Sequence, residues 1–508
     1  MSRTRRLRQQ QRRATEKVQA AAAAQPPVPR ASLWLATAFL LPNLGALFCG
    51  FVYDDVPIIV ENQSLHVHSL RQLAHIFASG YWPDRRALGL YRPVSQTLWA
   101  LTWASGRGPH PALFHALGLA LGLAVVLLLY RFLLVVHTPP RTAFIAALLF
   151  ALFPIHIEAT TSVVGSTELL AAFFGLGALL LYYRDRPIPA LMLFALAILS
   201  KESAATFAAL PVVFPRKDWR SRTSLLTAGG AAAIVAGALL AHHLVAQGSH
   251  TPAIDNPMGL VETAPRVFTA LWVQCLYLFK TVLPITLSAD YSYKQIPLVM
   301  GLQDGRAWLG LALAGGTLLL AWRRPQFRAP VLAYAILFSA TANLLFPIGT
   351  VMGERLMYVP SLAFALLLAI LLARSRYWKA VLLAVALLFA ARTVARNLDW
   401  LNADRFYTRM VETSPNSAKA DYYYGILRAA RGDDAGAIVA YDRAIAIFPA
   451  YSEAYHNRGN ALARLGRRAE AMASYRQCLR FDPGHMGAMA NLTQLQAGLP
   501  LNPPRQHL

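Results

Sequence analysis

Long apolar runs separated by short polar stretches make up most of this chain. The first run, residues 33–51, contains no charged side chain and is close to the roughly 20 residues that a helix needs to cross a bilayer. Because a bilayer offers no water to unpaired backbone groups, each run is expected to be helical. We therefore predict an all-α, polytopic membrane protein. The eleven predicted spans, several of which must borrow flanking residues, lie at about residues 33–51, 111–136, 143–154, 169–183, 188–199, 204–214, 225–245, 307–322, 331–346, 358–373 and 380–391.

Residues 264–284 are a further apolar stretch, which we predict to lie along the membrane surface. Basic clusters fall on alternate loops, and cytoplasmic loops are enriched in Lys and Arg. This alternation places the N-terminus and all the clusters on the cytoplasmic side, whereas a span at residues 264–284 would move the last two clusters outside. Trp272, Tyr277 and Lys280 also suit a helix in the headgroup region. The C-terminal part then lies outside. The clusters are Arg141; Arg184 and Arg186; Arg216, Lys217, Arg220 and Arg222; Arg323, Arg324 and Arg328; and Arg374, Arg376 and Lys379.

From about residue 393 the apolar runs give way to a repeat. Pro415, Pro449 and Pro483 are spaced 34 residues apart, which is the period of the tetratricopeptide repeat. Small residues and tyrosines recur at the same spacing, as expected where two helices pack closely and a proline ends the second one. We predict about two and a half repeats over residues 393–508, ending in a capping helix. The recurring pairs are Gly425 and Gly459, Ala437 and Ala471, and Tyr441 and Tyr475.

Composition agrees with a membrane protein and excludes an ordinary soluble enzyme. Of the 508 residues, 56% are hydrophobic and 14% are charged, against about 25% charged in soluble domains. We interpret the net charge of +23 as cytoplasmic loop charge rather than nucleic-acid binding. Residues 1–30 are predicted to form a basic, disordered cytoplasmic tail, and residues 31–392 the membrane core with an outer loop at 52–110. The three cysteines are far apart and predict neither a zinc site nor a disulfide framework.

Charged residues at the outer ends of the spans are the candidates for a functional site. Asp54 and Asp55 follow the first run directly, and ionisable residues at a membrane face are functional-site hypotheses. A carboxylate can act as a general base, and the sequence leaves open which of the two does so, or whether they only cap a turn. Arg92, Lys201 and Arg355 could bind and stabilise a departing phosphate. Helix-end charge without a reactive role is the alternative for these cations.

Four further side chains are predicted to support this site. Glu202 and Glu354 each lie next to a candidate cation in the sequence and would either hold it in place or neutralise it. His156 and Glu158 are two residues apart and could also be read as a metal pair. Because no third ligand occurs at a nearby spacing, we predict no metal site, and a divalent metal is an unsupported option.

Taken together, the polar motifs resemble those of the transmembrane and tetratricopeptide repeat-containing protein O-mannosyltransferases. The likeness runs in the same order from about residue 51 to the repeats, and the ordered set is more specific than any single motif. That family resembles the GT-C glycosyltransferases in its membrane core, and those enzymes use polyprenyl-phosphate sugars on the non-cytoplasmic face with an acidic motif in the first outer loop. By this resemblance Asp54 and Asp55 match the acidic motif. The motifs are FVYDD at 51–55, YRP at 91–93, FPIHIEA at 153–159, VVG at 163–165, LSKE at 199–202, NP at 256–257, LSADYS at 287–292 and ERLMYVPS at 354–361.

The resemblance implies a GT-C-like glycosyltransferase that transfers a sugar, expected to be mannose, from a polyprenyl-phosphate donor to Ser or Thr hydroxyls of protein. A single displacement would invert the anomeric centre. The expected partners are the lipid-linked donor, an acceptor protein, membrane lipid and a protein bound to the repeats, with no certain cofactor and no nucleic acid. The expected location is a bacterial inner or plasma membrane with periplasmic repeats.

Two features depart from the family pattern, and three other functions stay open. Members usually carry more repeats than this chain, and a basic residue is commoner at the position of Ser166. The chain could instead transfer another lipid-linked sugar to a glycan or lipid acceptor. It could also be a membrane-anchored repeat scaffold without catalysis, although an anchor needs one span rather than eleven. A transporter is the third alternative, although the sequence lacks paired broken helices in two matching halves.

Overall fold

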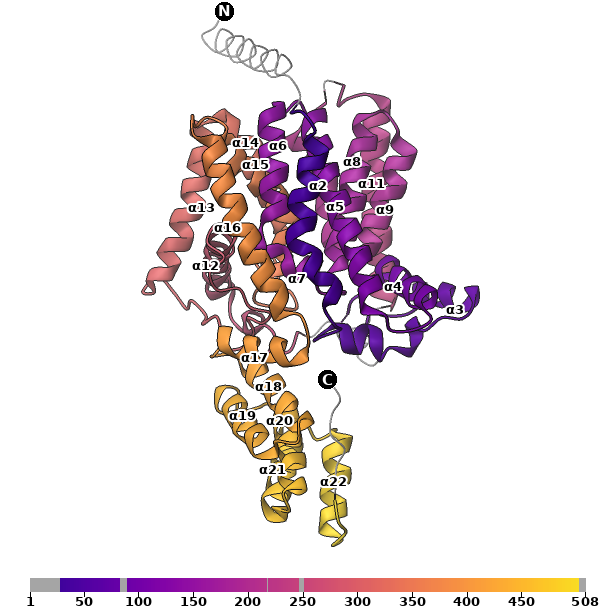
Figure 1. Cartoon of the computed structure of the whole chain (residues 1–508), viewed down its shortest axis with the longest axis vertical. Coiled ribbons are helices and arrows are strands. Elements are labelled where there is room, and N and C mark those ends of the chain that lie inside the picture. Colours follow the sequence, from indigo (N-terminus) through magenta and orange to yellow (C-terminus); the bar gives the residue numbers. More distant parts are fainter. Residues whose placement is uncertain (1–27, 83–88, 217, 246–250, 502–508) are drawn as a thin grey trace, which may run out of the picture.

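The computed structural model describes residues 28–82, 89–216, 218–245 and 251–501. Within these ranges the regular structure is helical and contains no strand, which confirms the predicted all-α class. Figure 1 shows a bundle of upright helices with the repeats at its lower end, whereas α2 (Ala31–Asn43) begins at the upper end. The predicted basic tail, residues 1–30, lies outside the described ranges except for its last three residues.

The bundle helices follow the predicted apolar runs. In the described part of the chain, six helices are long and apolar enough to cross a membrane, and a seventh span results if α6 and the segment Pro154–Thr160 count as one span bent by 53°. The protein is therefore a multi-pass membrane protein. Eleven spans stay a prediction, because runs such as α9, with 14 residues, are too short on their own. Besides α2, the bundle contains α5 (Pro111–Val135), α6 (Pro140–Leu152), α8 (Ser166–Tyr183), α9 (Pro187–Ser200), α10 (Leu210–Val213), α11 (Arg222–Val245), α13 (Gly305–Arg323), α14 (Arg328–Ser339), α15 (Tyr358–Leu372) and α16 (Trp378–Asp399).

The stretch predicted to lie along the membrane surface forms α12 (Thr263–Val282). Figure 1 views this helix end-on, across the direction of α13 and α16. It is strongly amphipathic, because one side is buried against the bundle while Phe279 and Val282 are exposed. The Tyr277 hydroxyl donates to the carbonyl of Gly353 at 3.0 Å, which fixes α12 to the segment before α15. Its depth in the membrane stays a prediction.

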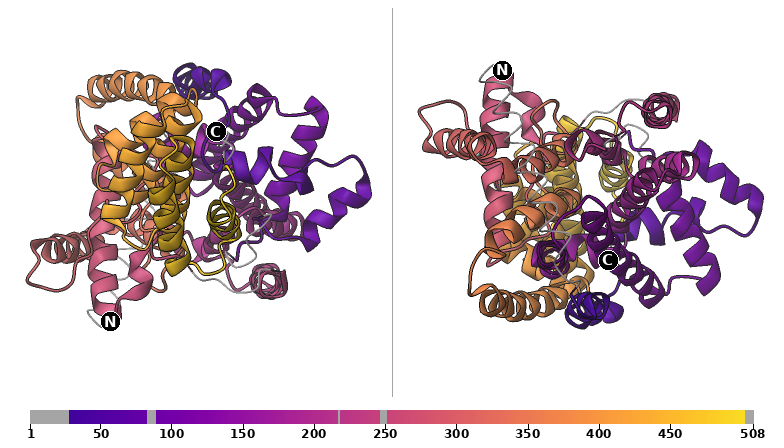
Figure 2. Two further views of the ribbon diagram at one scale, coloured as in Figure 1. Left: turned by 90° about the horizontal axis from the view of Figure 1, so that it is seen from below. Right: turned by 90° about the horizontal axis from the view of Figure 1, so that it is seen from above.

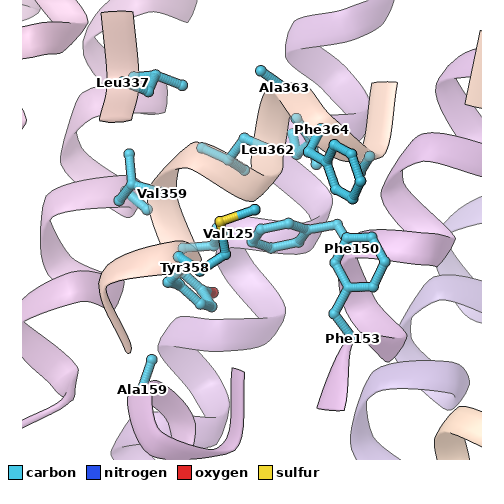
Figure 3. Packing of buried hydrophobic residues seen from close by; sticks show 14 of the residues in the cluster. Val125, Phe150, Phe153, Ala159, Leu337, Tyr358, Val359, Leu362, Ala363 and Phe364 are labelled. Carbon is cyan, nitrogen blue, oxygen red and sulfur yellow. The ribbon is translucent and has the colours of Figure 1, made fainter. Parts of the chain in front are cut away.

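The largest buried cluster lies where α5, α6, α14 and α15 meet (Figure 3). Phe150 of α6 and Tyr358 of α15 pack edge to face with ring centroids 5.1 Å apart. Val125, Leu337 and Leu362 fill the space around them. This packing sets the position of the N-terminal end of α15, where the candidate residue Arg355 lies.

The outer loop is itself folded, around short helices that include α3 (Leu70–His75) and α4 (Pro93–Gly106). Ile58, Ile59, Tyr81 and Trp99 are buried in one small cluster with Val163 and Val164. The Trp99 indole donates to the Ser166 hydroxyl at 2.9 Å, which attaches α4 to the start of α8. The loop is therefore held against the bundle end rather than extending into solvent.

The repeats are antiparallel helix pairs whose recurring glycines lie against tyrosines. A Cβ at Gly425 would come within 2.5 Å of the Tyr441 ring, and a Cβ at Gly459 would come equally close to the Tyr475 ring. The 34-residue pattern thus records a close approach of two helices that only glycine permits. The helices are α17 (Ala403–Thr413), α18 (Ala418–Ala430), α19 (Asp434–Ile447), α20 (Ser452–Arg464), α21 (Arg468–Phe481) and α22 (Met486–Gln496).

The repeats attach directly to the loops at the lower end of the bundle. Seen from below in Figure 2, they cover one side of that end, and the outer-loop helices lie beside them. The Ala418 N–H donates to the carbonyl of Tyr293 at 2.8 Å, and the Ser414 hydroxyl donates to the carbonyl of Asp290 at 2.6 Å. Lys419 forms an ion pair with Asp255 at 2.8 Å. The first repeat is therefore docked through both backbone and side chains.

Candidate active site

The centre of the candidate site is a contact between Asp54 and Arg355. Asp54 lies in the turn after the first span, and Arg355 lies in the short helix Glu354–Met357 that precedes α15. Both terminal nitrogens of the guanidinium approach Asp54 Oδ2 at 3.2 Å. Asp54 is only partly buried, and 21% of its side chain is exposed. The fold thus joins two sequence motifs that are 301 residues apart.

Asp55 is fully buried and has a different set of contacts. Its carboxylate accepts hydrogen bonds from the Ser162 hydroxyl at 3.1 Å and from the N–H groups of Val163 and Val164 at 3.2 and 2.9 Å. Burial raises the pKa of Asp55 to about 7, although these three donors oppose the rise. A Cβ at Gly165 would come within 2.4 Å of the carbonyl of Glu158, so the turn that presents these donors requires glycine.

Glu158 holds Arg355 in place. It lies in α7 (Ile157–Thr160) and accepts the Arg355 backbone N–H at 2.9 Å, while its other oxygen lies 3.4 Å from the guanidinium Nε. A guanidinium has five N–H donors, and Asp54 accepts from the two terminal nitrogens of Arg355. Each of these nitrogens has a second N–H that the contact with Asp54 does not use.

Arg92 and Lys201 are each paired with a carboxylate. Arg92 forms a two-point contact with Glu202, at 2.9 Å from Nε and 2.6 Å from a terminal nitrogen. Lys201 is buried and pairs with Glu168 of α8. The guanidinium of Arg92 also lies over the Tyr81 ring, 5.1 Å from its centroid. Glu202 therefore holds Arg92, not the neighbouring Lys201.

Tyr81 connects the two groups of charge. It is buried, and its hydroxyl interacts electrostatically with Arg92 and Arg355 and with both candidate aspartates. Burial raises the pKa of Tyr81 to about 12, against the opposing effect of the two guanidiniums. Sequence reasoning counted Glu168 among the outer-face charges without assigning it a role, and it passed over Tyr81. No pattern distinguished Tyr81 from other aromatic residues of the loop.

Glu354 and His156 lie in other surroundings. Glu354 accepts hydrogen bonds from the Tyr291 hydroxyl and the Ser288 N–H, both at 2.6 Å, and lies 3.4 Å from Arg396. The contacts with Ser288 and Tyr291 fix the loop on which the first repeat docks through Asp290. The His156 Nε2 is 2.8 Å from the hydroxyl of Ser361, and its ring packs in the aromatic core of the bundle. Among the described residues no group of three or more His, Cys, Asp or Glu side chains could hold a metal ion.

An apolar cavity of about 710 Å³ lies between α6, α15 and α16, next to the end of α12. Phe153, Leu368 and Val385 are among the side chains that line it. Arg392 also lines it and donates to the carbonyl of Pro284 at 2.7 Å. One helical turn further along α16, Arg396 contacts Glu354. The cavity thus extends to within a turn of the segment that carries Arg355.

Comparisons with known proteins test the resemblance stated from the sequence. The model of "Protein O-mannosyl-transferase TMTC, DUF1736" matches residues 248–318, and two tetratricopeptide models match residues 425–466 and 452–485. The resemblance to the TMTC family is confirmed. The predicted repeats are confirmed as well. The TMTC segment contains Asp255 and Asp290, which contact the first repeat, so the matched region includes the attachment between core and repeats.

Curated TMTC proteins align with most of the chain at low identity. Mouse Protein O-mannosyl-transferase TMTC3 is 26% identical over 89% of this chain and 56% of its own length. Human TMTC1 is 27% identical over 80% of this chain and 54% of its own length. The chain thus spans little more than half the length of these relatives. A solved oligosaccharyltransferase from Archaeoglobus fulgidus, tethered with an acceptor peptide, is similar over 77% of this chain and 59% of that chain, with 13% identity and a TM-score of 0.40.

Proposed function

We propose that this chain is a membrane glycosyltransferase that transfers a sugar, expected to be mannose, from a polyprenyl-phosphate donor to Ser or Thr hydroxyls of a polypeptide. The observation that carries the proposal is the contact between the partly exposed side chain of Asp54 and the guanidinium of Arg355. A general base and a cation lie side by side at one end of a membrane bundle, and the names of the TMTC relatives support this class of reaction.

In the proposed reaction Asp54 takes the proton of the acceptor hydroxyl. The hydroxyl oxygen forms a bond to the anomeric carbon as the bond from that carbon to the phosphate oxygen breaks, and polyprenyl phosphate leaves. A base must lie within hydrogen-bond reach of the proton it takes, and Asp54 is partly exposed, whereas Asp55 is enclosed. Asp55 then serves to hold the turn that positions Asp54.

Arg355 would stabilise the negative charge that develops on the departing phosphate. Charge stabilisation by fixed donors in a water-poor site is among the largest contributions to catalysis. Arg92 would lie further from the reacting bond, connected through Tyr81. Lys201 is buried in an ion pair with Glu168, and its proposed role is to hold the chain next to Glu202, which binds Arg92. The apolar cavity beside α16 would accept part of the lipid chain.

The proposed orientation rests on the arrangement of the chain ends. α2 begins at the end of the bundle opposite the repeats (Figure 1), and Asp54 lies at the other end, because the preceding Tyr53 packs on Tyr423 of the first repeat. With the N-terminus on the cytoplasmic side, as the basic loops predict, both the site and the repeats would face the non-cytoplasmic space. The proposal therefore places donor and acceptor on the same outer face.

The test is sugar transfer by detergent-purified protein. Wild type and the Asp54→Asn/Asp55→Asn double variant are incubated with radiolabelled polyprenyl-phosphate mannose and a Ser/Thr-rich peptide. Label in the peptide from wild type alone supports the proposal. Donor consumption without peptide label would contradict the polypeptide acceptor, and label found only with another donor sugar would contradict mannose. Equal transfer by the double variant would exclude the acidic pair from the reaction.

A further inference from the structure

Tyr53 joins the candidate active site to the first repeat. It directly precedes Asp54, and its backbone has a φ of 56°, in the left-handed region that non-glycine residues seldom occupy. Its ring packs edge to face on Tyr423 of α18, with centroids 5.2 Å apart, and lies 5.8 Å from Phe406 of α17. Strained backbone of this kind persists where the surroundings fix it and clusters at functional sites. The repeat helices therefore fix the residue next to Asp54.

The first repeat is part of the site's surroundings and not a loosely tethered module. Backbone hydrogen bonds join Gly50 to Leu401 and Lys294 to Asn416, at 3.0 and 2.9 Å. The Ser417 hydroxyl donates to the Asp290 carboxylate. The first repeat is thus docked on the core next to the contact between Tyr53 and Tyr423. Tyr423 of α18 therefore lies beside the residue that precedes Asp54.

The surface around Tyr53 and Tyr423 is aromatic and close to electrically neutral. The side chains of Tyr53 and Tyr423 are each partly buried, so part of their surface is accessible. Tyr423 also stacks on Tyr407 of α17, with ring centroids 5.5 Å apart. The ammonium of Lys419 lies 5.7 Å from the centre of the Tyr53 ring, and its charge is balanced by Asp255. Such a surface favours contact with an apolar or proline side chain over contact with a charged one.

We propose that the first repeat forms one wall of the acceptor site, in which Tyr53 and Tyr423 hold an apolar side chain of the acceptor polypeptide beside the hydroxyl that faces Asp54. This inference rests on the proposed transfer to polypeptide. It assigns the first repeat a direct part in choosing the acceptor sequence, because residues flanking the modified Ser or Thr would contact the two rings. A glycan acceptor could also stack on aromatic rings, and the experiment separates the two.

The test measures acceptor binding separately from the reaction at the donor. Full-length wild type, Tyr423→Ala and Tyr423→Phe are assayed at varied concentrations of two peptides, in which the acceptor Thr is flanked either by Val and Pro or by Asp. Hydrolysis of the donor in the absence of peptide is measured alongside. Tyr455→Ala is the matched control, because it removes a partly buried tyrosine of the second repeat that packs on Phe481.

We expect Tyr423→Ala to raise KM for the peptide with apolar flanks by about tenfold, a typical cost of removing an aromatic anchor. The preference of the enzyme for this peptide over the one with acidic flanks should then be lost. Donor hydrolysis should change less than KM for the peptide, because Phe406 still packs on Tyr53. Tyr423→Phe keeps the ring and should retain the preference for the apolar peptide, and Tyr455→Ala should behave as wild type. If the alanine variant does not fold, Tyr423→Leu keeps an apolar side chain there and should still weaken the preference.

Three outcomes would overturn the inference. One is an unchanged peptide KM and preference in the Tyr423 variants. A second is an equal loss of donor hydrolysis, which would show that Tyr423 acts on the position of Asp54 and not on the acceptor. A third is wild-type transfer to a free oligosaccharide but to neither peptide. Wild type that consumes no donor under any condition would instead contradict the proposed function itself.

Discussion

Glu354 and Arg355 are adjacent in the chain, but their side chains enter two separate clusters. Arg355 contacts Asp54 and Glu158 at the candidate site. Glu354 is fully buried and binds Arg396 of α16 and Tyr291, which lies in the loop that supports the repeats. Successive side chains at the start of a helix point about 100° apart, so neighbours in sequence need not share a site. Substitutions at the two positions should therefore have different consequences.

Arg355→Ala should lower the rate of sugar transfer by about 10²–10³-fold, the usual cost of removing one donor from a charge-stabilising site. The transfer rate of Arg355→Lys should lie between those of wild type and Arg355→Ala, because the lysine ammonium keeps the positive charge but lacks the planar arrangement of N–H donors. The measurement is kcat for transfer with saturating donor and peptide. Arg306→Ala is the control, since it breaks a comparable pair with Asp304 at the start of α13. An Arg355→Ala rate above one tenth of wild type would contradict the role.

The contact between Glu354 and Arg396 is predicted to serve stability. Arg396→Ala should lower the free energy of unfolding by about 3–5 kcal/mol, because it leaves a buried carboxylate without its cation. The double variant Glu354→Gln/Arg396→Met should recover most of that loss, since neither charge is then buried. Thermal unfolding in detergent, followed by intrinsic fluorescence, measures both. A double variant no more stable than Arg396→Ala would show that the charges are not coupled.

The sequence predicted the apolar runs, the repeats and the end of the bundle where the charges gather. These features depend on local patterns: run length, the 34-residue period and the position of acids after a span. The pairing of charges could not be predicted, because it depends on how distant helices meet. Glu202 contacts Arg92 from 110 residues away, and Lys201 contacts Glu168. His156 was a candidate metal ligand from its position in the sequence, but its ring packs against Phe150 in the core of the bundle.

The different roles of the two aspartates also could not be predicted from the sequence. Sequence alone could not distinguish Asp54 from Asp55, because both follow the first span and either could be the base. Their difference arises from the turn at residues 162–164, which donates three hydrogen bonds to Asp55 and leaves Asp54 facing Arg355. The repeat helices add a constraint that no local motif reveals, since Tyr423 contacts Tyr53 across 370 residues of chain.

Filling the apolar cavity should weaken binding of the donor's lipid chain. Val385→Trp places a large ring among the lining side chains of α16, and we expect KM for a long polyprenyl donor to rise by about tenfold, the effect of roughly 1.4 kcal/mol. KM for a donor with a truncated prenyl chain should change less, because less of it reaches the cavity. Leu383→Trp is the matched control, since Leu383 is 61% exposed on the same helix. Equal effects of both variants on both donors would contradict this placement.

The buried carboxyl of Asp55 should make stability depend on pH. Its pKa is about 7 in the folded protein, against an ordinary value of 3.8, so the folded state binds the proton more tightly than the unfolded state. The stabilisation from this group is therefore fully present below pH 3.8 and is lost as pH rises through 7. Asp55→Asn has no proton to lose. The free energy of unfolding of wild type should thus fall by about 2 kcal/mol relative to Asp55→Asn between pH 5 and 7.

Ser162→Ala gives this prediction an internal control. The hydroxyl of Ser162 donates to Asp55 and helps to lower its pKa, so its removal should move the loss of stability to higher pH without abolishing it. The experiment is thermal unfolding of wild type, Asp55→Asn and Ser162→Ala in detergent at half-unit steps from pH 5 to 8. Parallel pH profiles for wild type and Asp55→Asn would show that Asp55 does not change protonation in this range. The three donors of the turn would then outweigh burial, and Asp55 would be a permanent anion beneath Asp54.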